Sequence, residues 1–86
     1  MGTVAITLRI LPEGPEVDIV RLTADVRDAL GSRLKTLERR PFAYGLTALM
    51  VTVLVDDASG GSEAIETELA ALPGVSSAEA TDLSLV

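Results

Sequence analysis

Two kinds of hydrophobic spacing follow one another along this chain, and their order restricts the folds that it can adopt. Residues 3–11 alternate between apolar and polar side chains, which is typical of a strand with one buried face. Residues 46–55 show the same period of two. Two weaker strands are predicted over residues 33–44, where Pro41 suits a sheet edge, and over residues 75–84.

Two amphipathic helices are predicted between these strands. The first follows Asp18, a residue suited to an N-cap, and ends at Gly31. The second follows Ser62 and ends at Pro73. Each helix carries one apolar stripe, formed by Ile19, Leu22, Val26, Ala29 and Leu30 in the first and by Ile65, Leu69 and Leu72 in the second.

The resulting order of elements is βαββαβ. Two helices with one apolar stripe each must cover one face of a four-stranded antiparallel sheet. We therefore predict an α+β fold, a ferredoxin-like βαββαβ sandwich, as a single domain over residues 1–86. The predicted core consists of Val4, Ile6, Leu8, Leu22, Val26, Leu49, Val51, Val53, Ile65 and Leu69.

The composition excludes several kinds of chemistry. The chain has no His, Cys, Trp, Asn or Gln. Without His or Cys it has no Ser-His or Cys-His nucleophile, no ordinary zinc site and no disulfide. Carboxylate-only catalysis and an oxygen-ligated metal stay open, although we interpret the acidic loop at residues 56–61 as a solvated connection. We predict no catalytic residues, no metal and no cofactor.

The charges are distributed unevenly along the chain. All seven basic residues lie within the first 40 positions, residues 41–86 carry only acids, and the formal net charge is −6. Nucleic acids are bound through clustered Lys and Arg, so we expect no direct nucleic-acid contact and favour a protein partner with a basic surface.

Targeting signals are not evident in the sequence. The apolar runs are shorter than the ~20 residues that a membrane span needs. The N-terminus passes directly into the first strand without the pattern of a signal peptide. We therefore expect no membrane association and a cytoplasmic location.

Phe42 and Tyr44 are the only aromatic residues, and they lie between Pro41 and Gly45. In a regular strand both rings would share one face and could simply contribute to the core. The flanking proline and glycine argue against a regular strand here. We expect one ring, Tyr44 rather than Phe42, to be at least partly exposed at a corner, which is typical of a protein interface.

Three stretches, in this order and at matching spacing, resemble the archaeal elongation factor 1-beta proteins and the C-terminal exchange domains of the eukaryotic beta and delta subunits. They are "MGTVAITLRILPEGPEVDI", "PFAYGLTALMVTVLVDD" and "GGSEAIETELAALPGVSSAEATDL", and the resemblance spans the whole chain. It implies a ferredoxin-like exchange-factor domain that promotes GDP release from GDP-bound elongation factor 1-alpha during protein synthesis. Such a protein regulates a GTPase and is not itself an enzyme.

The resemblance also implies two partner-binding regions. The first is an aromatic corner, formed by Phe42, Tyr44, Gly45 and Leu46. The second is a C-terminal tip that approaches the partner's magnesium and phosphate site, formed by Asp82, Leu83, Ser84, Leu85 and Val86.

The chain departs from the family pattern in its charges. Family members usually carry a basic residue near the end and another after the aromatic–glycine pair, whereas here the tip has none and Thr47 or Ala48 stands at the second place. Any displacement of Mg²⁺ is therefore expected to be steric, through Leu85 and Val86, or to act by shifting the partner's loops. Otherwise the chain is a weaker exchange factor.

Two alternatives stay open at this point. One is an interaction or regulatory module of the same fold without exchange activity. The other is a small-molecule-binding domain that dimerises through its open sheet face, where Met50 and Leu54 would lie.

Overall fold

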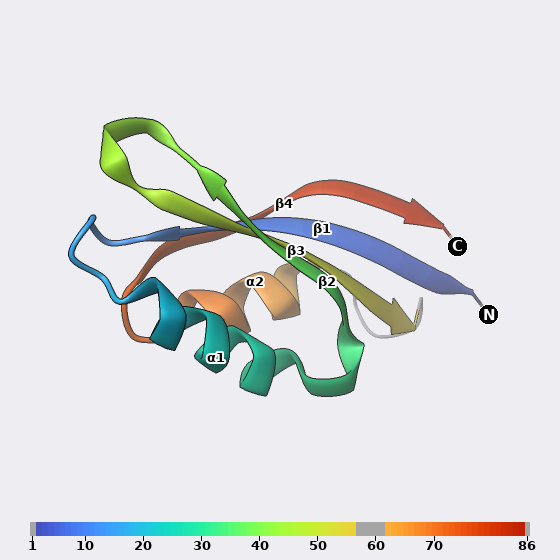
Figure 1. Cartoon of the computed structure of the whole chain (residues 1–86). Helices are drawn as coiled ribbons and strands as arrows, with labels where there is room; N and C mark the ends of the chain where they lie inside the picture. The colour runs from blue at the N-terminus through green and yellow to red at the C-terminus, as the bar shows by residue number, and fades with distance from the viewer. Residues whose placement is uncertain (1, 57–61, 86) are drawn as a thin grey trace.

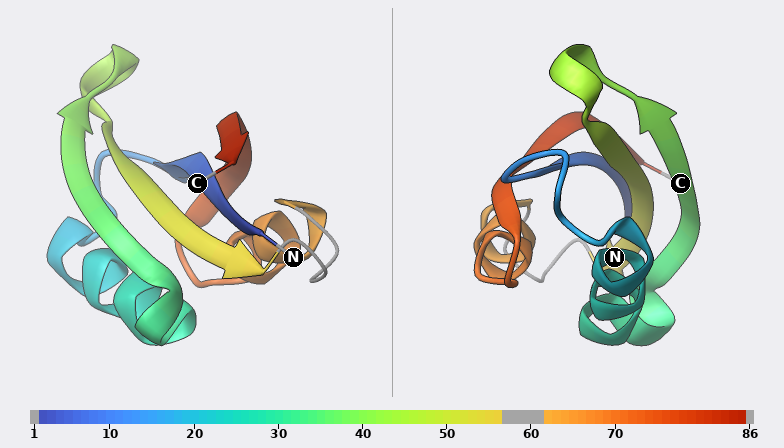
Figure 2. Two further views of the ribbon diagram at one scale, coloured as in Figure 1. Left: turned by 90° about the vertical axis from the view of Figure 1, so that its right-hand side faces the viewer. Right: turned by 60° about the vertical axis from the view of Figure 1, so that its left-hand side comes forward.

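Four antiparallel strands form one sheet, and both helices cover the same face of it (Figures 1 and 2). The computed structural model describes residues 2–56 and 62–85. In chain order the elements are β1 (Thr3–Pro12), α1 (Ile19–Leu30), β2 (Leu34–Pro41), β3 (Thr47–Asp56), α2 (Ser62–Ala70) and β4 (Val75–Leu85), with short 3₁₀ turns at Gly31–Arg33 and Ala43–Gly45. The strand order is β2-β3-β1-β4. This arrangement confirms the predicted ferredoxin-like fold.

The core lies between the helices and the two central strands, β1 and β3. Ile6 pairs with Val53 and Leu8 with Val51, so these four side chains share the face that the helices cover. All ten residues predicted for the core are buried. The period-two pattern of the sequence therefore identified the correct face of both central strands.

The second strand was predicted too long. It was expected over residues 33–44 and instead occupies Leu34–Pro41, at an edge of the sheet. Tyr44 and Gly45 have φ angles of +63° and +75°, which a strand cannot accommodate. The bounds of the other two later strands differ from the prediction by one residue, and the acidic loop lies largely outside the described residues.

Helix α1 begins and ends with specific hydrogen bonds. The Asp18 carboxylate accepts from the backbone N–H groups of Val20 and Arg21 at 3.0 and 3.3 Å, which confirms the predicted N-cap. At the other end Gly31 has a φ angle of +57° and its N–H donates to the carbonyl of Arg27.

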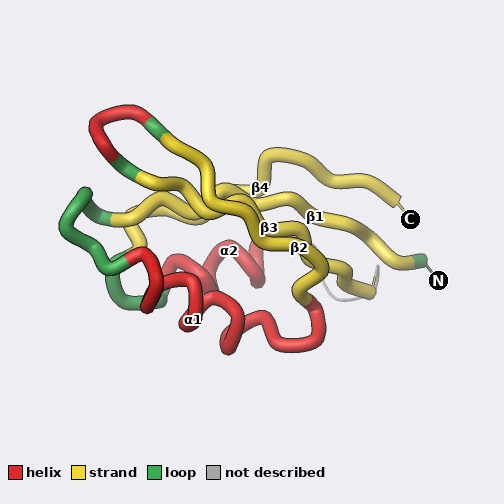
Figure 3. The backbone as a smooth tube through the Cα atoms, in the orientation of Figure 1, coloured by secondary structure: helices red, strands yellow, loops and turns green. Residues whose placement is uncertain are grey.

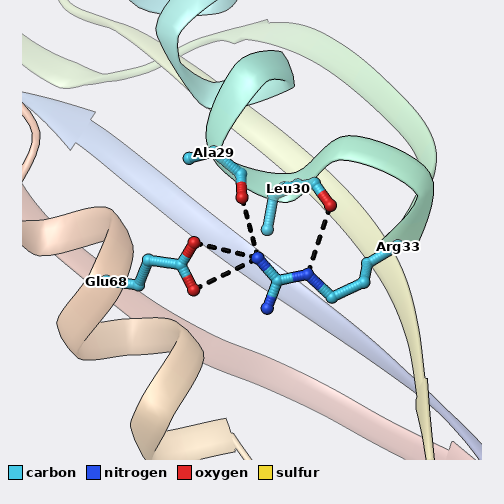
Figure 4. A network of polar contacts seen from close by, with 4 residues as sticks. All are labelled: Ala29, Leu30, Arg33 and Glu68. Carbon is cyan, nitrogen blue, oxygen red and sulfur yellow. Dashed lines mark hydrogen bonds and ion pairs between the residues drawn. The ribbon is translucent and has the colours of Figure 1, made fainter.

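Arg33 joins the C-terminal end of α1 to α2 (Figure 4). Its Nε donates to the Leu30 carbonyl at 3.2 Å, and its Nη2 donates to the Ala29 carbonyl at 2.7 Å. The same Nη2 contacts both carboxylate oxygens of Glu68, at 2.9 and 3.2 Å. One side chain thus satisfies two terminal carbonyls of a helix and links it to the neighbouring helix.

We expect Arg33→Met to lower the free energy of unfolding by about 1–2 kcal/mol, because it removes these carbonyl hydrogen bonds and the ion pair together. The value is modest because both side chains in the pair are more than one-third exposed. Urea unfolding measures it. Arg27→Met is the control, since it removes the same charge from the last turn of α1, with an expected loss of about 0.5 kcal/mol. Equal losses in both variants would contradict a bridging role for Arg33.

Candidate partner-binding site

The aromatic corner, residues 42–46, closes the hairpin between β2 and β3. Beyond the last strand pair, Pro41 with Thr47, the Phe42 N–H donates to the Leu46 carbonyl at 2.8 Å. The Leu46 N–H donates to the Ala43 carbonyl at 3.3 Å. Figure 3 shows that this end of the hairpin projects beyond the sheet, on the side away from the helices. The corner is therefore presented outward by two strands.

Tyr44 is 91% exposed, which confirms that this ring faces outward. Its backbone lies in the left-handed region, with φ 63° and ψ 30°, and it is the only described residue other than glycine with a positive φ. That conformation costs a side chain with a Cβ roughly 1–2 kcal/mol. The exposed ring gains almost no burial in return, so stability of the fold does not account for tyrosine at this position.

Phe42 behaves differently from Tyr44. Its ring is 38% exposed and faces the guanidinium of Arg9, whose Cζ lies 5.3 Å from the ring centroid. Arg9 also forms an ion pair with Glu79 of β4. The sequence analysis did not identify Arg9. The only indication in the sequence is that Arg9 is the one basic residue on the polar face of the first strand.

The C-terminal tip presents two apolar side chains to solvent. Leu83 and Leu85 are 54% and 76% exposed. Their strand partners, Ile6 and Val4, lie in the core, so both leucines are on the helix-facing side of the sheet. Val86 lies outside the described residues.

The other predicted tip residues lie on the opposite face of the sheet. Asp82 pairs with Thr7 and Ser84 pairs with Ala5, and both side chains are exposed. The tip therefore has one apolar and one polar side.

The two regions do not form a single site. The corner follows the Thr47 end of β3, whereas the tip pairs with the start of β1, beside the Asp56 end of β3. A ten-residue strand separates them, which is about 30 Å. Figure 1 shows the hairpin end and the C-terminus at opposite ends of the molecule, whose largest dimension is 42 Å.

Two acidic side chains of α2 form hydrogen bonds within the fold. Glu68 pairs with Arg33, and the Glu66 carboxylate accepts from the Ala80 N–H at 2.7 Å. Across the described ranges, 2–56 and 62–85, no three acidic side chains lie close enough to hold a metal ion. In the same ranges no helix has the length and apolar character to cross a bilayer.

The chain is thus a domain of ferredoxin-like fold with exposed side chains at each end of its sheet, Tyr44 at one and Leu83 and Leu85 at the other. A model of the EF-1 guanine nucleotide exchange domain matches residues 5–86. The elongation factor 1-beta of Methanothermobacter thermautotrophicus is 41% identical over 85 residues, which covers 96% of each chain. That of Methanoculleus marisnigri is 41% identical over 86 residues and all of both chains, and that of Methanococcoides burtonii is 42% identical over 87 residues and 96% of each.

The chain therefore belongs to the EF-1 guanine nucleotide exchange family. It is a translation elongation factor with a guanine-nucleotide exchange role, so a module of this fold without exchange activity is not favoured.

Proposed function

We propose that this chain, as a single exchange domain, promotes the release of GDP from elongation factor 1-alpha. The observation that carries the proposal is Tyr44, an exposed aromatic in an unfavourable backbone conformation at a projecting corner. Strained residues cluster at functional sites, and exposed aromatic rings are frequent energetic centres of protein interfaces. Membership of the exchange family supplies the partner that fits this role.

Exchange of this kind needs no catalytic residue in the chain. A GTPase holds its nucleotide through backbone donors, a lysine and Mg²⁺. A partner that prefers the nucleotide-free or Mg²⁺-free state weakens nucleotide binding by the same factor by which the nucleotide weakens partner binding. No covalent bond forms or breaks in the regulator. The chain is thus proposed to be a regulator of a GTPase.

Because the aromatic corner and the C-terminal tip are far apart, we assign them different roles in exchange. The aromatic corner binds the partner through Tyr44, with Phe42, Gly45 and Leu46 shaping the surface around the ring. The C-terminal tip, about 30 Å away along the sheet, acts on the magnesium and phosphate site. A continuous hydrogen-bonded sheet joins the two regions, so binding at the corner fixes the position of the tip.

The test is release of a fluorescent GDP analogue from a cognate elongation factor 1-alpha, with and without the chain, against excess unlabelled GDP. Acceleration that increases with the concentration of the chain is expected. No acceleration, together with dimerisation by light scattering and ligand-dependent melting, would support the small-molecule alternative instead. Met50 and Leu54 give that alternative limited support, because both are partly buried on the open face.

The tip is expected to act as an apolar wedge, so Leu85→Lys should lower kcat/KM for exchange by about 10-fold. The exposed leucine can bury most of its side chain against the partner, and loss of that burial corresponds to about 1.5 kcal/mol. Stimulated GDP release measures the effect.

Ser76→Lys is the control for the tip, because it adds the same charge to an exposed position of β4 at the end of the strand remote from the tip. It should leave the rate nearly unchanged. Faster exchange by Leu85→Lys would instead indicate that the chain is a weakened form of a charge-based mechanism. An unchanged rate both in Leu85→Lys and after removal of residues 85–86 would exclude the tip from exchange.

We also propose that the chain makes no direct contact with nucleic acid. The net charge is −6, and three of its six arginines, Arg9, Arg33 and Arg40, are already paired with carboxylates.

A further inference from the structure

We propose that Arg9 is a positioning residue for exchange, which holds the aromatic corner through Phe42 so that Tyr44 is presented in one orientation. The inference rests on the proposed role of the corner in partner binding. It concerns a residue that lies in the central strand of the sheet rather than in either exposed region.

The Arg9 side chain lies between two elements that are far apart in the sequence. On the sheet it is flanked by Met50 of β3 and Glu79 of β4, its strand partners on either side. Its guanidinium pairs with the Glu79 carboxylate and lies over the Phe42 ring, with Cζ 5.3 Å from the ring centroid. The open face of β1 is thereby connected both to the corner and to the strand that ends in the tip.

The corner has few other restraints. Only two backbone hydrogen bonds close it beyond the last strand pair, and the end of a two-stranded hairpin has little stability of its own. The left-handed backbone at Tyr44 adds an unfavourable term that other contacts must offset. Within the part of the chain that the structure describes, the Arg9 contact is the one cation–ring interaction that holds the corner against the sheet.

Arginine suits this position better than lysine does. A planar guanidinium can lie over a ring and pair with a carboxylate at the same time, whereas an ammonium group offers no flat surface. The Nε atom of Arg9 is buried without a hydrogen-bond partner among the described residues. An unfavourably buried donor indicates that the ring contact and the ion pair, rather than full hydrogen bonding, determine where this side chain lies.

The experiment uses the intrinsic fluorescence of Tyr44, which is the only tyrosine in a chain without tryptophan. Arg9→Lys keeps the charge and Arg9→Met keeps much of the bulk, but neither keeps the planar group. Both should lower the anisotropy of Tyr44 fluorescence. Arg9→Met should also raise the concentration of the chain needed for half-maximal GDP release by about 5-fold, the size expected for a partly exposed cation–ring contact. The maximal rate and the melting temperature should stay nearly unchanged.

Arg40→Met is the matched control, because Arg40 pairs with Glu38 at 2.9 Å on the neighbouring edge strand. It removes the same charge near the corner and should change neither readout. Equal effects of Arg40→Met and Arg9→Met would overturn the proposal, because charge alone would then account for them.

Two further outcomes separate this inference from the proposed function. Unchanged anisotropy and half-maximal concentration in both Arg9 variants, with slow exchange by Tyr44→Ala, would overturn the role of Arg9 alone. Unchanged exchange by Tyr44→Ala would overturn the role of the corner, and the positioning role of Arg9 with it.

Discussion

Replacement of Tyr44 by alanine is expected to slow stimulated GDP release by at least ~30-fold at subsaturating concentrations of the chain, with the fold intact. Truncation of an interface aromatic of this kind commonly costs 2 kcal/mol or more of binding free energy. The ring is 91% exposed in the free chain, so nearly all of its surface is available to a partner. Release of fluorescent GDP measures the rate, and circular dichroism reports the fold.

Tyr44→Asn is a more stringent test, because it is expected to increase stability while it decreases the rate of exchange. Asparagine tolerates the left-handed region that Tyr44 occupies, so the free energy of unfolding should rise by roughly 0.5–1 kcal/mol. Exchange should still be slowed as in the alanine variant. Tyr44→Phe keeps the ring and should retain most of the activity. Wild-type exchange by Tyr44→Asn would show that the strained tyrosine has no role in the interface.

Leu69→Ala is expected to lower the free energy of unfolding by about 2–5 kcal/mol. Leu69 is fully buried on α2 and belongs to the single core cluster beneath the sheet. Removal of its side chain loses apolar burial and leaves a cavity that a short helix can only partly fill. Small domains are typically stable by 5–15 kcal/mol, so this one change removes a large share.

The control for Leu69 is Leu85→Ala, since that leucine is 76% exposed and its truncation should change stability by less than about 0.5 kcal/mol. Urea unfolding at constant temperature compares the two variants. A loss below 1 kcal/mol for Leu69→Ala would contradict the packing described for α2.

The fold could be derived from the sequence because its determinants are local and periodic. Strand and helix periods mark the buried faces directly, and the cap at Asp18 needs only the next few residues. The exposure of Tyr44 followed from a similar local argument about Pro41 and Gly45. In each case the information lies within one element or one turn.

The contacts that sequence analysis missed join residues from different elements. Arg33 appears in the sequence as an ordinary cation after a helix, and its link to Glu68 depends on how the two helices pack. The same holds for Arg9 and Phe42, which come from β1 and from the end of the β2–β3 hairpin and meet only in the folded chain. Neither pair has a spacing that a periodic pattern would reveal.

The exposed leucines of the tip illustrate a second limit. Alternation places Leu83 and Leu85 on the same face as the core, which would predict burial. Helix α2 has nine residues and is about 14 Å long, whereas the eleven residues of β4 extend over about 35 Å. A helix this short covers only part of the strand. Whether a residue on the core side of β4 is buried therefore depends on the relative lengths of α2 and β4 as well as on the alternation of the sequence.

The hydrogen bond between Glu66 and the Ala80 N–H has a consequence for behaviour at high concentration. Because β4 is an edge strand, a free backbone donor there could pair with a strand of another molecule and begin aggregation. The Glu66 carboxylate accepts the hydrogen bond from the Ala80 N–H. Next to Ala80, the register between β4 and β1 also shifts. These two features protect the middle of this edge against pairing with a strand of another molecule.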